Sequence, residues 1–527
     1  MKISSLADGL YLFARDVVVW KETKHERRKE SKMIVPALED AKRILSNSEY
    51  KVIPVMRIIP SDFTTPIEVM RKLKNVSRHC FMLESVEDAK QWGRYTFLGY
   101  DPKLELTCLD HELTVKSGME FTQKVAHPGE YIRKILAENK SVRMEGMPSF
   151  TGGLVGYFSY DYIKYPEPTL VLDAKDEESF KDVDLMLFDK VIAFDNLKQE
   201  INIIVNIKAS DIETEYNRAI AETADIARLI REGKNADIAP LKLKSEFTPL
   251  FNEEEYCQMV EKAKHYIHEG DIFQVVLSNR LMAQMEGSLF DTYRKLRMVN
   301  PSPYMFYFSS DDVEIAGASP ETLVKLEDGV LHTFPLAGTR PRGKTKEEDD
   351  RLEVELLADE KERSEHNMLV DLGRNDIGKI SKIGSVKVEK YMEIERYSHV
   401  MHIGSTVRGD ILDTKDAVDA VDSILPAGTL SGAPKLRACE IINELENNKR
   451  GIYGGAVGYI DFTGNLDTCI AIRLAFSKNG KVFVRSGAGI VADSVPKNEY
   501  RECINKAKAV MKSIEEAQGG IDNDSVD

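Results

Sequence analysis

The sequence predicts a mixed α/β protein whose first part is rich in strands and whose second part alternates strands with helices. From Tyr50 to about Ile207, apolar residues recur in short alternating runs bounded by turn residues, as at Phe97–Gly99 and Leu185–Ile192. Such runs are typical of strands. Beyond them, apolar residues take helical spacing. The length of 527 residues suits two or more domains, or one unusually large core.

The N-terminal part is predicted to comprise an extension and a first folded region. Residues 1–49 are expected to be a partly disordered extension, because the apolar stretch Leu10–Trp20 is interrupted by charges and followed by a charged run. This pattern does not resemble a signal peptide. Residues 50–234 form the first region, which ends in a helix over Ile212–Arg231 that Gly233 closes.

The second region is expected to follow a linker. Residues 235–252 mix Pro240, Pro249 and charges, which indicates a linker. Residues 253–517 form the second region and begin with a helix over Glu253–Gly270. The last residues, 518–527, are rich in Gly and Asp and are expected to be disordered.

Two segments of these regions resemble each other. Gly152-Gly153-Leu154-Val155-Gly156-Tyr157-Phe158 is similar to Gly454-Gly455-Ala456-Val457-Gly458-Tyr459-Ile460. Glycines within strands mark bulges or a close approach of two backbones. The similarity indicates either related sheets in the two regions or two similar local solutions.

Composition excludes several classes of protein. The net charge of −15, from 72 basic and 87 acidic residues, disfavours sequence-independent nucleic-acid binding. No run of 18 apolar residues is present, so no transmembrane helix is predicted. The six cysteines are scattered without a C-x-x-C pair, which disfavours zinc and indicates free thiols in the cytoplasm.

Two acid pairs at helical spacing are the first candidates for chemistry. Glu499 and Glu502 share a helix face with Lys506, in a helix that Ser494 is expected to cap. Glu362 and Glu365 repeat the same spacing. One such pair alone is usually a solvated surface. Two helices that each offer a pair can hold Mg²⁺, which prefers few carboxylates, several waters and an anionic substrate.

Three loops are suited to binding an anion. The segment Ser486–Gly489 allows close approach of its backbone. The strand Phe334–Gly343 runs into a turn of Gly, Pro and Arg. The loop Pro426–Lys435 opens a helix with small residues, without the order of a nucleotide-binding P-loop.

Taken in order, these segments resemble the chorismate-utilising enzymes, and within that family the branch of the anthranilate synthase large subunits. The resemblance covers about Tyr50 to Ala517 and rests on Gly317–Glu321, Pro335–Gly343, Glu365–Asp376, Pro426–Lys435, Tyr453–Tyr459 and Gly487–Ser494. It implies an α/β (α+β) fold of two large, mostly antiparallel sheets packed around a core, with helices outside. It also implies chorismate as substrate and Mg²⁺ as cofactor.

The resemblance implies roles for individual residues. By matching position, Glu365 and Glu502 resemble the metal ligands, and Glu362 and Glu499 their water-mediated companions. The residues that hold or line the substrate are Gly338, Thr339, Thr429, Tyr453, Arg473, Gly487, Gly489 and Lys506. Arg473 lies in the apolar run Ala471–Leu474, which indicates a strand, and a buried Arg there needs an anionic partner.

Proton transfer is assigned to two further residues by the same resemblance. Glu321 matches the general acid that protonates the hydroxyl leaving from C4, a role that needs a raised pKa. His402 matches the histidine near the C2 proton. His399, three residues earlier, is interpreted as structural.

Two positions separate this branch from its neighbours. Ala337 stands where aminodeoxychorismate synthases carry a nucleophilic lysine, and Gln274 where isochorismate and salicylate synthases carry a lysine that activates water. Neither residue can serve those reactions, so both favour anthranilate over the aminodeoxychorismate alternative. A non-catalytic tryptophan-binding regulatory protein remains a second alternative, because Leu83–Ser85, Trp92–Tyr95 and Asn300–Met305 resemble the family's feedback site.

The resemblance also implies two partners besides chorismate. Tryptophan is expected to inhibit through Ser85, Pro303, Tyr304 and Met305, with Val457 and Tyr459 as links to the active site. No cysteine lies in a Gly-rich elbow that would expose a glutaminase nucleophile. Ammonia is therefore expected from a separate glutamine amidotransferase subunit, component II.

Overall fold

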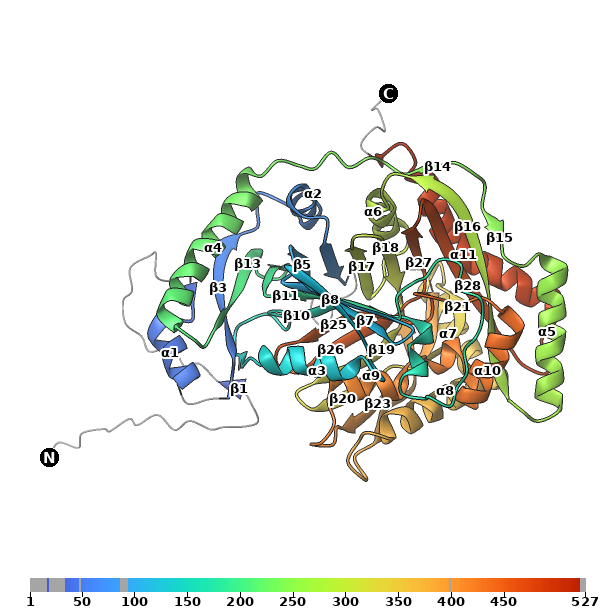
Figure 1. Ribbon diagram of the computed structural model, residues 1–527. Coiled ribbons are helices and arrows are strands. Elements are labelled where there is room, and N and C mark those ends of the chain that lie inside the picture. Colours follow the sequence, from blue (N-terminus) through green and yellow to red (C-terminus); the bar gives the residue numbers. More distant parts are fainter. Residues whose placement is uncertain (1–16, 19–33, 47–48, 86–92, 398–399, 522–527) are drawn as a thin grey trace.

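Two large antiparallel sheets form the centre of the molecule, with helices on their outer faces, as Figure 1 shows. The computed structural model describes residues 17–18, 34–46, 49–85, 93–397 and 400–521. The predicted α/β fold of two large antiparallel sheets is confirmed. The expected disorder of the two ends falls largely on residues outside these ranges.

The larger sheet has 14 strands, of which 12 follow one path and two, β15 and β24, pair with β16. The path runs through β14 (Lys242–Leu243), β16 (Gln274–Glu286), β28 (Lys481–Ile490), β27 (Leu474–Lys478), β18 (Glu314–Ser319), β17 (Tyr304–Ser309), β4 (Cys80–Glu84), β5 (Tyr95–Tyr100), β12 (Lys190–Asp195), β13 (Glu200–Lys208), β3 (Val52–Pro60) and β2 (Ile34–Val35). The two side strands are β15 (Thr248–Pro249) and β24 (Gly432–Ala433).

The second sheet has 12 strands, and in it β22 (Lys387–Arg396) pairs off the main path with β23. The path runs through β21 (Leu336–Pro341), β23 (Val400–Asp410), β20 (Val330–Thr333), β19 (Thr322–Glu327), β26 (Leu466–Ile470), β25 (Ala456–Asp461), β10 (Gly153–Phe158), β11 (Val183–Phe188), β6 (Leu104–Leu109), β7 (Glu112–Ser117) and β8 (Met119–Lys124). A separate pair joins β1 (Val17–Val18) to β9 (Arg143–Met144).

Helices cover the outer faces of both sheets (Figure 1). They are α1 (Leu38–Ser46), α2 (Pro66–Val76), α3 (Gly129–Glu138), α4 (Ile212–Glu232), α5 (Glu253–His268), α6 (Phe290–Val299), α7 (Lys346–Ala358), α8 (Glu360–Gly378), α9 (Ala417–Ile424), α10 (Lys435–Glu446) and α11 (Pro496–Glu516), with 3₁₀ turns η2 (Tyr160–Lys164) and η3 (Gly428–Leu430). Two of them, α4 and α5, confirm the predicted helices, and Asn252 begins α5 with a capping box.

The main core lies between the two sheets. Aromatic residues of the larger sheet, such as Phe81 and Phe306, belong to the same buried cluster as Leu154 and Tyr157 of the second sheet. A second cluster packs α4, α6 and α11 against the outer face of the larger sheet. Burial on both faces explains why several central strands, β10, β11 and β12 among them, are continuously apolar or buried rather than alternating.

The two similar glycine-rich segments are neighbours in one sheet. β10 pairs antiparallel with β25, and Gly156 lies opposite Gly458. A Cβ on Gly153 would lie 2.2 Å from the carbonyl oxygen of Ile460, and one on Gly455 would lie 2.1 Å from that of Phe158. The similarity therefore marks a tight seam between the N-terminal and C-terminal parts within one sheet, and not two separate related sheets.

Both sheets combine strands from both parts of the chain, and the strands of each part are neighbours within a sheet. β3, β4, β5, β12 and β13 join the larger sheet beside strands of residues 253–517, while β6–β8, β10 and β11 join the second. The segment 235–252 contributes β14 and β15, which both pair with β16. None of the helices in the described ranges is long and apolar enough to cross a membrane. All six cysteines are free, as predicted.

We predict that Gly156→Ala destabilises the protein by about 2–3 kcal/mol, because the new methyl group meets a sheet carbonyl that cannot move without breaking the β10–β11 pairing. Chemical denaturation followed by circular dichroism measures the loss. Gly378→Ala is the matched control: its Cβ meets no atom within 4 Å, so its stability should stay within roughly 0.5 kcal/mol of the parent. Equal stability of the two variants would refute the close approach of β10 to β11 at Gly156.

Candidate active site

The chain crosses between the two sheets twice at the same place, and each crossing carries a site residue. Residues 320–321 connect β18 to β19, and residues 471–473 connect β26 to β27. The crossings lie side by side, because the Ile470 N–H donates to the Glu321 carbonyl at 3.0 Å and the Ala318 N–H donates to the Arg473 carbonyl at 3.1 Å. Glu321 and Arg473 therefore enter the junction of the two sheets together.

The strand predicted for Arg473 is wrong, because the chain turns there from one sheet into the other. Arg473 has φ of 54°, in the left-handed region. Burial lowers the pKa of its guanidinium. Among the described residues no carboxylate pairs with Arg473, and its side chain lines a cavity of about 450 Å³ with Asn498, Arg501, Glu502, Asn505 and Lys506. The anionic partner expected from the sequence can therefore be a ligand in this cavity.

Glu321 has the protonation behaviour of a general acid. Burial raises the pKa of its carboxyl to about 7, while a hydrogen bond from Thr429 Oγ1 at 3.1 Å and the charge of Lys506 oppose the rise. Thr429 lies in η3, inside the small-residue loop Pro426–Lys435. At neutral pH the carboxyl thus exists in comparable amounts in both forms, which suits proton transfer.

The two acid pairs lie on helices that cover different sheets. α8 packs against β21 and β23 of the second sheet, whereas α11 packs against β28 of the larger one. Burial raises the pKa of Glu365, and the charges of Glu362 and Glu502 raise it further. Burial and the charge of Glu502 likewise raise the pKa of Glu499. The pairs of the two helices are therefore close enough to repel each other.

The spacing of the four carboxylates bears on which cation they fit. Within the described ranges, only the His79 group discussed below places three ligand atoms within 4.8 Å of one another. The acid pairs are more open, so a cation between them completes its shell with water or substrate oxygens, as Mg²⁺ does. Glu502 also pairs with Lys506 at 2.7 Å, and Glu362 lies 3.6 Å from Arg340. The sequence reasoning did not single out Arg340, although its Arg-rich turn was the available signal.

Ser494 does not cap α11 as predicted. Val495 is the N-cap residue, and Pro496 takes the first position of the helix. Ser494 Oγ instead accepts the Val491 N–H at 3.1 Å, and its hydroxyl hydrogen-bonds Glu499, which lowers the pKa of that carboxyl. The serine therefore orients one of the four carboxylates.

His402 faces a bulge in the neighbouring strand. The β21–β23 register shifts between Ala337 and Arg340, and this places Gly338 and Thr339 beside His402. The Gly338 carbonyl lies 2.7 Å from His402 Nδ1. Because a carbonyl only accepts, Nδ1 carries the proton and Nε2 presents its lone pair. Burial and the charge of Arg473 lower the pKa of the imidazole, although the Gly338 carbonyl opposes this.

The glycines of β28 form a surface without side chains beside Tyr453. A Cβ on Gly487 would lie 2.7 Å from the Leu277 carbonyl and 3.2 Å from the Tyr453 hydroxyl. A Cβ on Gly489 would lie 2.7 Å from Gln274 Nε2. Lys506 Nζ donates to the Gly487 carbonyl at 3.2 Å. The two glycines therefore let β28 pack closely against Leu277, Tyr453 and Gln274, with the Lys506 ammonium bound to the same strand.

The two discriminating positions lie in different places around the site. Gln274 opens β16 opposite Ala433, and its buried Oε1 has no hydrogen-bond partner among the described residues. Ala337 is buried and pairs with Ile403. The third residue considered from the sequence, His399, lies outside the described residues.

The expected tryptophan residues meet at the ends of two paired strands. Met305 lies opposite Glu84, so Ser85, the residue after β4, lies opposite Tyr304. The buried Ser85 hydroxyl has no hydrogen-bond partner in the described part of the chain. The Tyr304 hydroxyl contacts Thr322 Oγ1 at 3.0 Å and Asp467 at 2.8 Å. Thr322 directly follows Glu321, which gives a short covalent path to the candidate acid. Trp92 lies outside the described residues.

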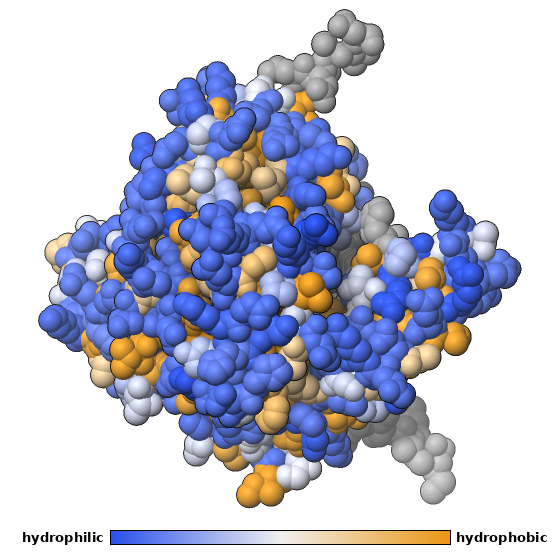
Figure 2. Space-filling model, turned by 90° about the vertical axis from the view of Figure 1, so that its right-hand side faces the viewer, coloured by the Kyte–Doolittle hydropathy of each residue, from blue (hydrophilic) through white to orange (hydrophobic). Residues whose placement is uncertain are grey.

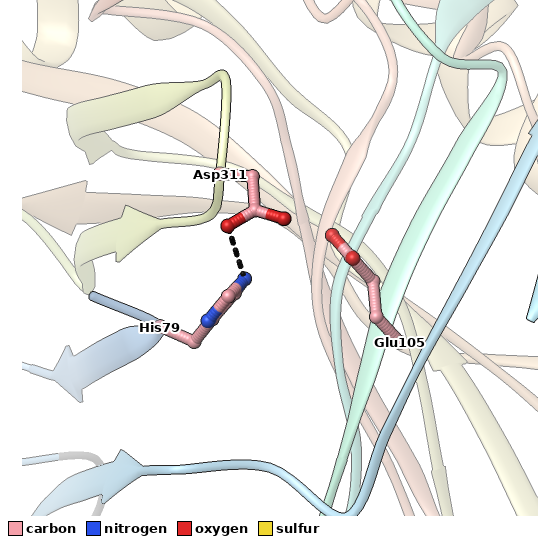
Figure 3. Close-up of side chains that lie close together, drawn as sticks. All are labelled: His79, Glu105 and Asp311. Atoms are coloured by element: carbon pink, nitrogen blue, oxygen red, sulfur yellow. Dashed lines mark ion pairs between the residues drawn. The ribbon is translucent and has the colours of Figure 1, made fainter. Parts of the chain in front are cut away.

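A separate group of His79, Glu105 and Asp311, drawn in Figure 3, has metal-like spacing. His79 Nε2 lies 3.2 Å from Asp311, and Lys116 Nζ lies 3.4 Å from both Glu105 and Asp311. Asp311 is half exposed. A lysine ammonium between two carboxylates accounts for this group without a metal ion.

The surface does not single out a docking area on the face in view. Figure 2 shows hydrophobic residues there in small, separate patches among hydrophilic ones. Large exposed apolar side chains of the described chain are scattered over many elements, with Met119, Phe273, Met298 and Ile383 among the most exposed.

The comparisons with known proteins agree with this geometry. The chorismate binding enzyme family matches residues 79–512. Anthranilate synthase component 1 of Acetivibrio thermocellus is 48% identical over 92% of this chain and 99% of its own length, and that of Aquifex aeolicus is 45% identical over 92% and 98%.

Solved structures show the same relationship. Anthranilate synthase component I from Streptococcus pneumoniae TIGR4 is 37% identical, with a TM-score of 0.70 over 86% of this chain and 98% of that one. The isochorismate synthase MenF from Escherichia coli shares the fold, with a TM-score of 0.65 at 19% identity over 91% of this chain and 99% of that one. The chain therefore belongs to the family of chorismate binding enzymes, in its anthranilate synthase component I branch.

Proposed function

We propose that the chain converts chorismate and ammonia to anthranilate and pyruvate in tryptophan biosynthesis, in the cytoplasm. The observation that carries the proposal is the convergence of Glu321, Arg473, His402 and two acid pairs at one junction of the sheets. Ala337 has no amine with which to form a covalent intermediate, so ammonia is the nucleophile that this site accommodates.

Each residue has a defined task in this reaction. Protonated Glu321 donates its proton to the hydroxyl that leaves C4, and Thr429 orients the carboxyl. His402 Nε2 accepts the C2 proton after ammonia has added and pyruvate leaves. Arg473, Lys506 and Tyr453 hold the enolpyruvyl carboxylate over Gly487 and Gly489. Gly338 and Thr339 fix the imidazole and border the ring.

The acid pairs fit a Mg²⁺ site. Glu365 and Glu502 are the proposed ligands, and Glu362 and Glu499 act through water. The raised pKa values of Glu365 and Glu499 reflect burial and repulsion by neighbouring carboxylates, which a divalent cation would relieve. When bound, Mg²⁺ supplies positive charge for the ring carboxylate.

The source of ammonia is proposed to be a separate glutamine amidotransferase subunit, component II. Cys80, Cys108, Cys439, Cys469 and Cys503 are buried, and burial raises the pKa of each thiol. Cys257 is the less buried sixth, and its thiol pKa is also raised by burial. Raised pKa values disfavour the thiolate that a glutaminase needs.

The purified chain is expected to make anthranilate and pyruvate from chorismate, Mg²⁺ and an ammonium salt at high pH, and almost none from glutamine. Product is identified by fluorescence and mass. Addition of EDTA should abolish turnover, and Glu502→Gln should lower it at least about 100-fold because a charge that holds the metal is lost. Glu515→Gln, on the same helix but away from the cavity, should be near normal. Brisk glutamine-dependent synthesis, or full activity in EDTA, contradicts the proposal.

We predict that Thr429→Val moves the basic limb of the pH–rate profile upward by about one pH unit, because it removes a hydrogen bond of roughly 1.5 kcal/mol to the ionised carboxylate. The acid acts when protonated, so activity falls as pH rises through the Glu321 pKa. Rates are compared at constant free ammonia. Thr429→Ser keeps the hydroxyl and should keep the limb in place. If the basic limb of Thr429→Val stays at the same pH or moves to lower pH, Glu321 is not the general acid.

Tryptophan is proposed to inhibit by binding at Ser85, Pro303, Tyr304 and Met305. Binding of tryptophan and chorismate should be mutually unfavourable. Tyr304→Phe, which loses the bonds to Thr322 and Asp467, should weaken this antagonism several-fold while the chain still turns over. Calorimetric titration of tryptophan with and without chorismate measures it. Equal tryptophan affinity in both titrations of the parent protein excludes this site as an inhibitory one.

A further inference from the structure

A buried cluster of three charges lies behind the candidate site. Glu446, Arg450 and Arg485 each expose 1% of their side chains. The Glu446 carboxylate accepts hydrogen bonds from Arg450 Nη2 at 2.6 Å, Arg450 Nε at 3.0 Å and Arg485 Nη2 at 2.7 Å. It also accepts the N–H and the hydroxyl of Ser278. The sequence signal for this cluster is the arginine that ends the apolar run Val482–Arg485.

Arg450 connects the cluster to the loop of Thr429. Its Nη1 donates to the Leu430 carbonyl at 2.6 Å, one residue after Thr429, and its Nη2 donates to the Val276 carbonyl at 2.7 Å. Its guanidinium carbon lies 4.5 Å from the Tyr160 ring and 6.0 Å from the Tyr453 ring. A single planar guanidinium thus holds the Thr429 loop, β16 and Tyr453 in a fixed relation.

Arg485 connects the cluster to the glycines of β28. Arg485, Gly487 and Gly489 lie on one face of the strand, because alternate residues share a face. Arg485 Nε donates to Ser278 Oγ at 2.8 Å, and Ser278 lies opposite Gly487 in the sheet. Arg485 Nη1 also bonds Asn448 Oδ1 and the Lys449 carbonyl. The strand beneath the proposed carboxylate position is therefore anchored to the same cluster.

The cluster carries one more positive than negative charge. Within the described chain, Glu446 is the carboxylate that pairs with Arg450 and Arg485. Burial disfavours ionised Glu446, but the two guanidinium charges hold its pKa below the usual value. Burying charges costs free energy that a well-packed apolar cluster would not require. The unbalanced charge acts strongly on nearby anions because the interior screens it poorly.

We propose that the Glu446–Arg450–Arg485 cluster is a positioning unit whose excess positive charge strengthens binding of the substrate carboxylate beside Gly487. This inference rests on the proposed function only in naming chorismate as the anion. The three residues do not contact substrate. They act through the Thr429 loop, Tyr453 and β28, and through their net charge.

Two substitutions at Arg485 separate charge from structure. Arg485→Lys keeps the charge, and Arg485→Met removes it, while both lose the guanidinium bonds. Chorismate binding is measured with Mg²⁺ and without ammonia, so that the readout does not depend on turnover. The dissociation constant should rise about tenfold for Arg485→Met, the effect of one unit charge across roughly 10 Å at an effective dielectric of about 20. It should stay within about threefold for Arg485→Lys.

Glu446→Gln provides the opposite change, because it raises the net charge while disturbing the same hydrogen bonds. Its chorismate affinity should equal or exceed that of the parent, although the looser Thr429 loop should lower kcat with ammonium. Arg57→Lys, which loses guanidinium bonds to Thr223 and the Ile220 carbonyl at the far edge of the larger sheet, should leave affinity and kcat unchanged.

The outcomes distinguish this inference from the proposed function. The role of charge would be overturned if all three variants lost affinity equally and in proportion to their loss of melting temperature. The three variants are Arg485→Lys, Arg485→Met and Glu446→Gln. If Arg485→Met does not fold, the changes in chorismate affinity of Arg485→Lys and Glu446→Gln decide whether charge has this role. A parent protein that binds chorismate but makes no anthranilate would overturn the proposed function. The affinities of the charge variants would still test the role of the cluster.

Discussion

Mutual repulsion of carboxylates on α8 and α11 is the constraint on which the site depends. Glu365 and Glu499 are partly buried, and burial together with neighbouring carboxylates raises the pKa of both. Such an arrangement is unfavourable unless a cation or a proton compensates it. The protein holds it because each helix is fixed by a different sheet, α8 on β21 and β23 and α11 on β28. The gap between the helices is therefore set by how the sheets pack.

The two crossings that carry Glu321 and Arg473 lie where the two packed sheets meet. Their hydrogen bonds join the crossings side by side. The acid, the guanidinium and the acid pairs thus meet where the chain changes sheets, a place that rigid strands hold from both sides. Loops alone would position these groups less well, since a catalytic arrangement requires side chains supported by packed elements.

Local sequence patterns predicted the features that depend on interactions within a single helix or strand. Helical spacing gave α4 and α5, and the i, i+3 spacing gave both acid pairs, because these depend only on residues within one element. The resemblance to a family supplied the two sheets and the roles of Glu321 and His402. The raised pKa of Glu321 required its surroundings, which no pattern within the sequence contains.

Contacts distant in sequence were not predictable from local patterns. Arg473 reads as part of an apolar strand, yet the chain turns there with positive φ because it passes between sheets. The similarity of β10 and β25 did not reveal that they pair. Arg485 and Glu446 are 39 residues apart and meet only in the folded core. In each case the deciding partner lies on another element.

The central claim is that Mg²⁺ and the substrate carboxylate share the site between the two acid pairs. Calorimetric titration of Mg²⁺ into the protein, with and without saturating chorismate, tests it most directly. The account predicts that chorismate tightens Mg²⁺ binding and that Mg²⁺ tightens chorismate binding by the same factor, as linkage requires. Equal Mg²⁺ affinity in the presence and absence of chorismate would contradict it.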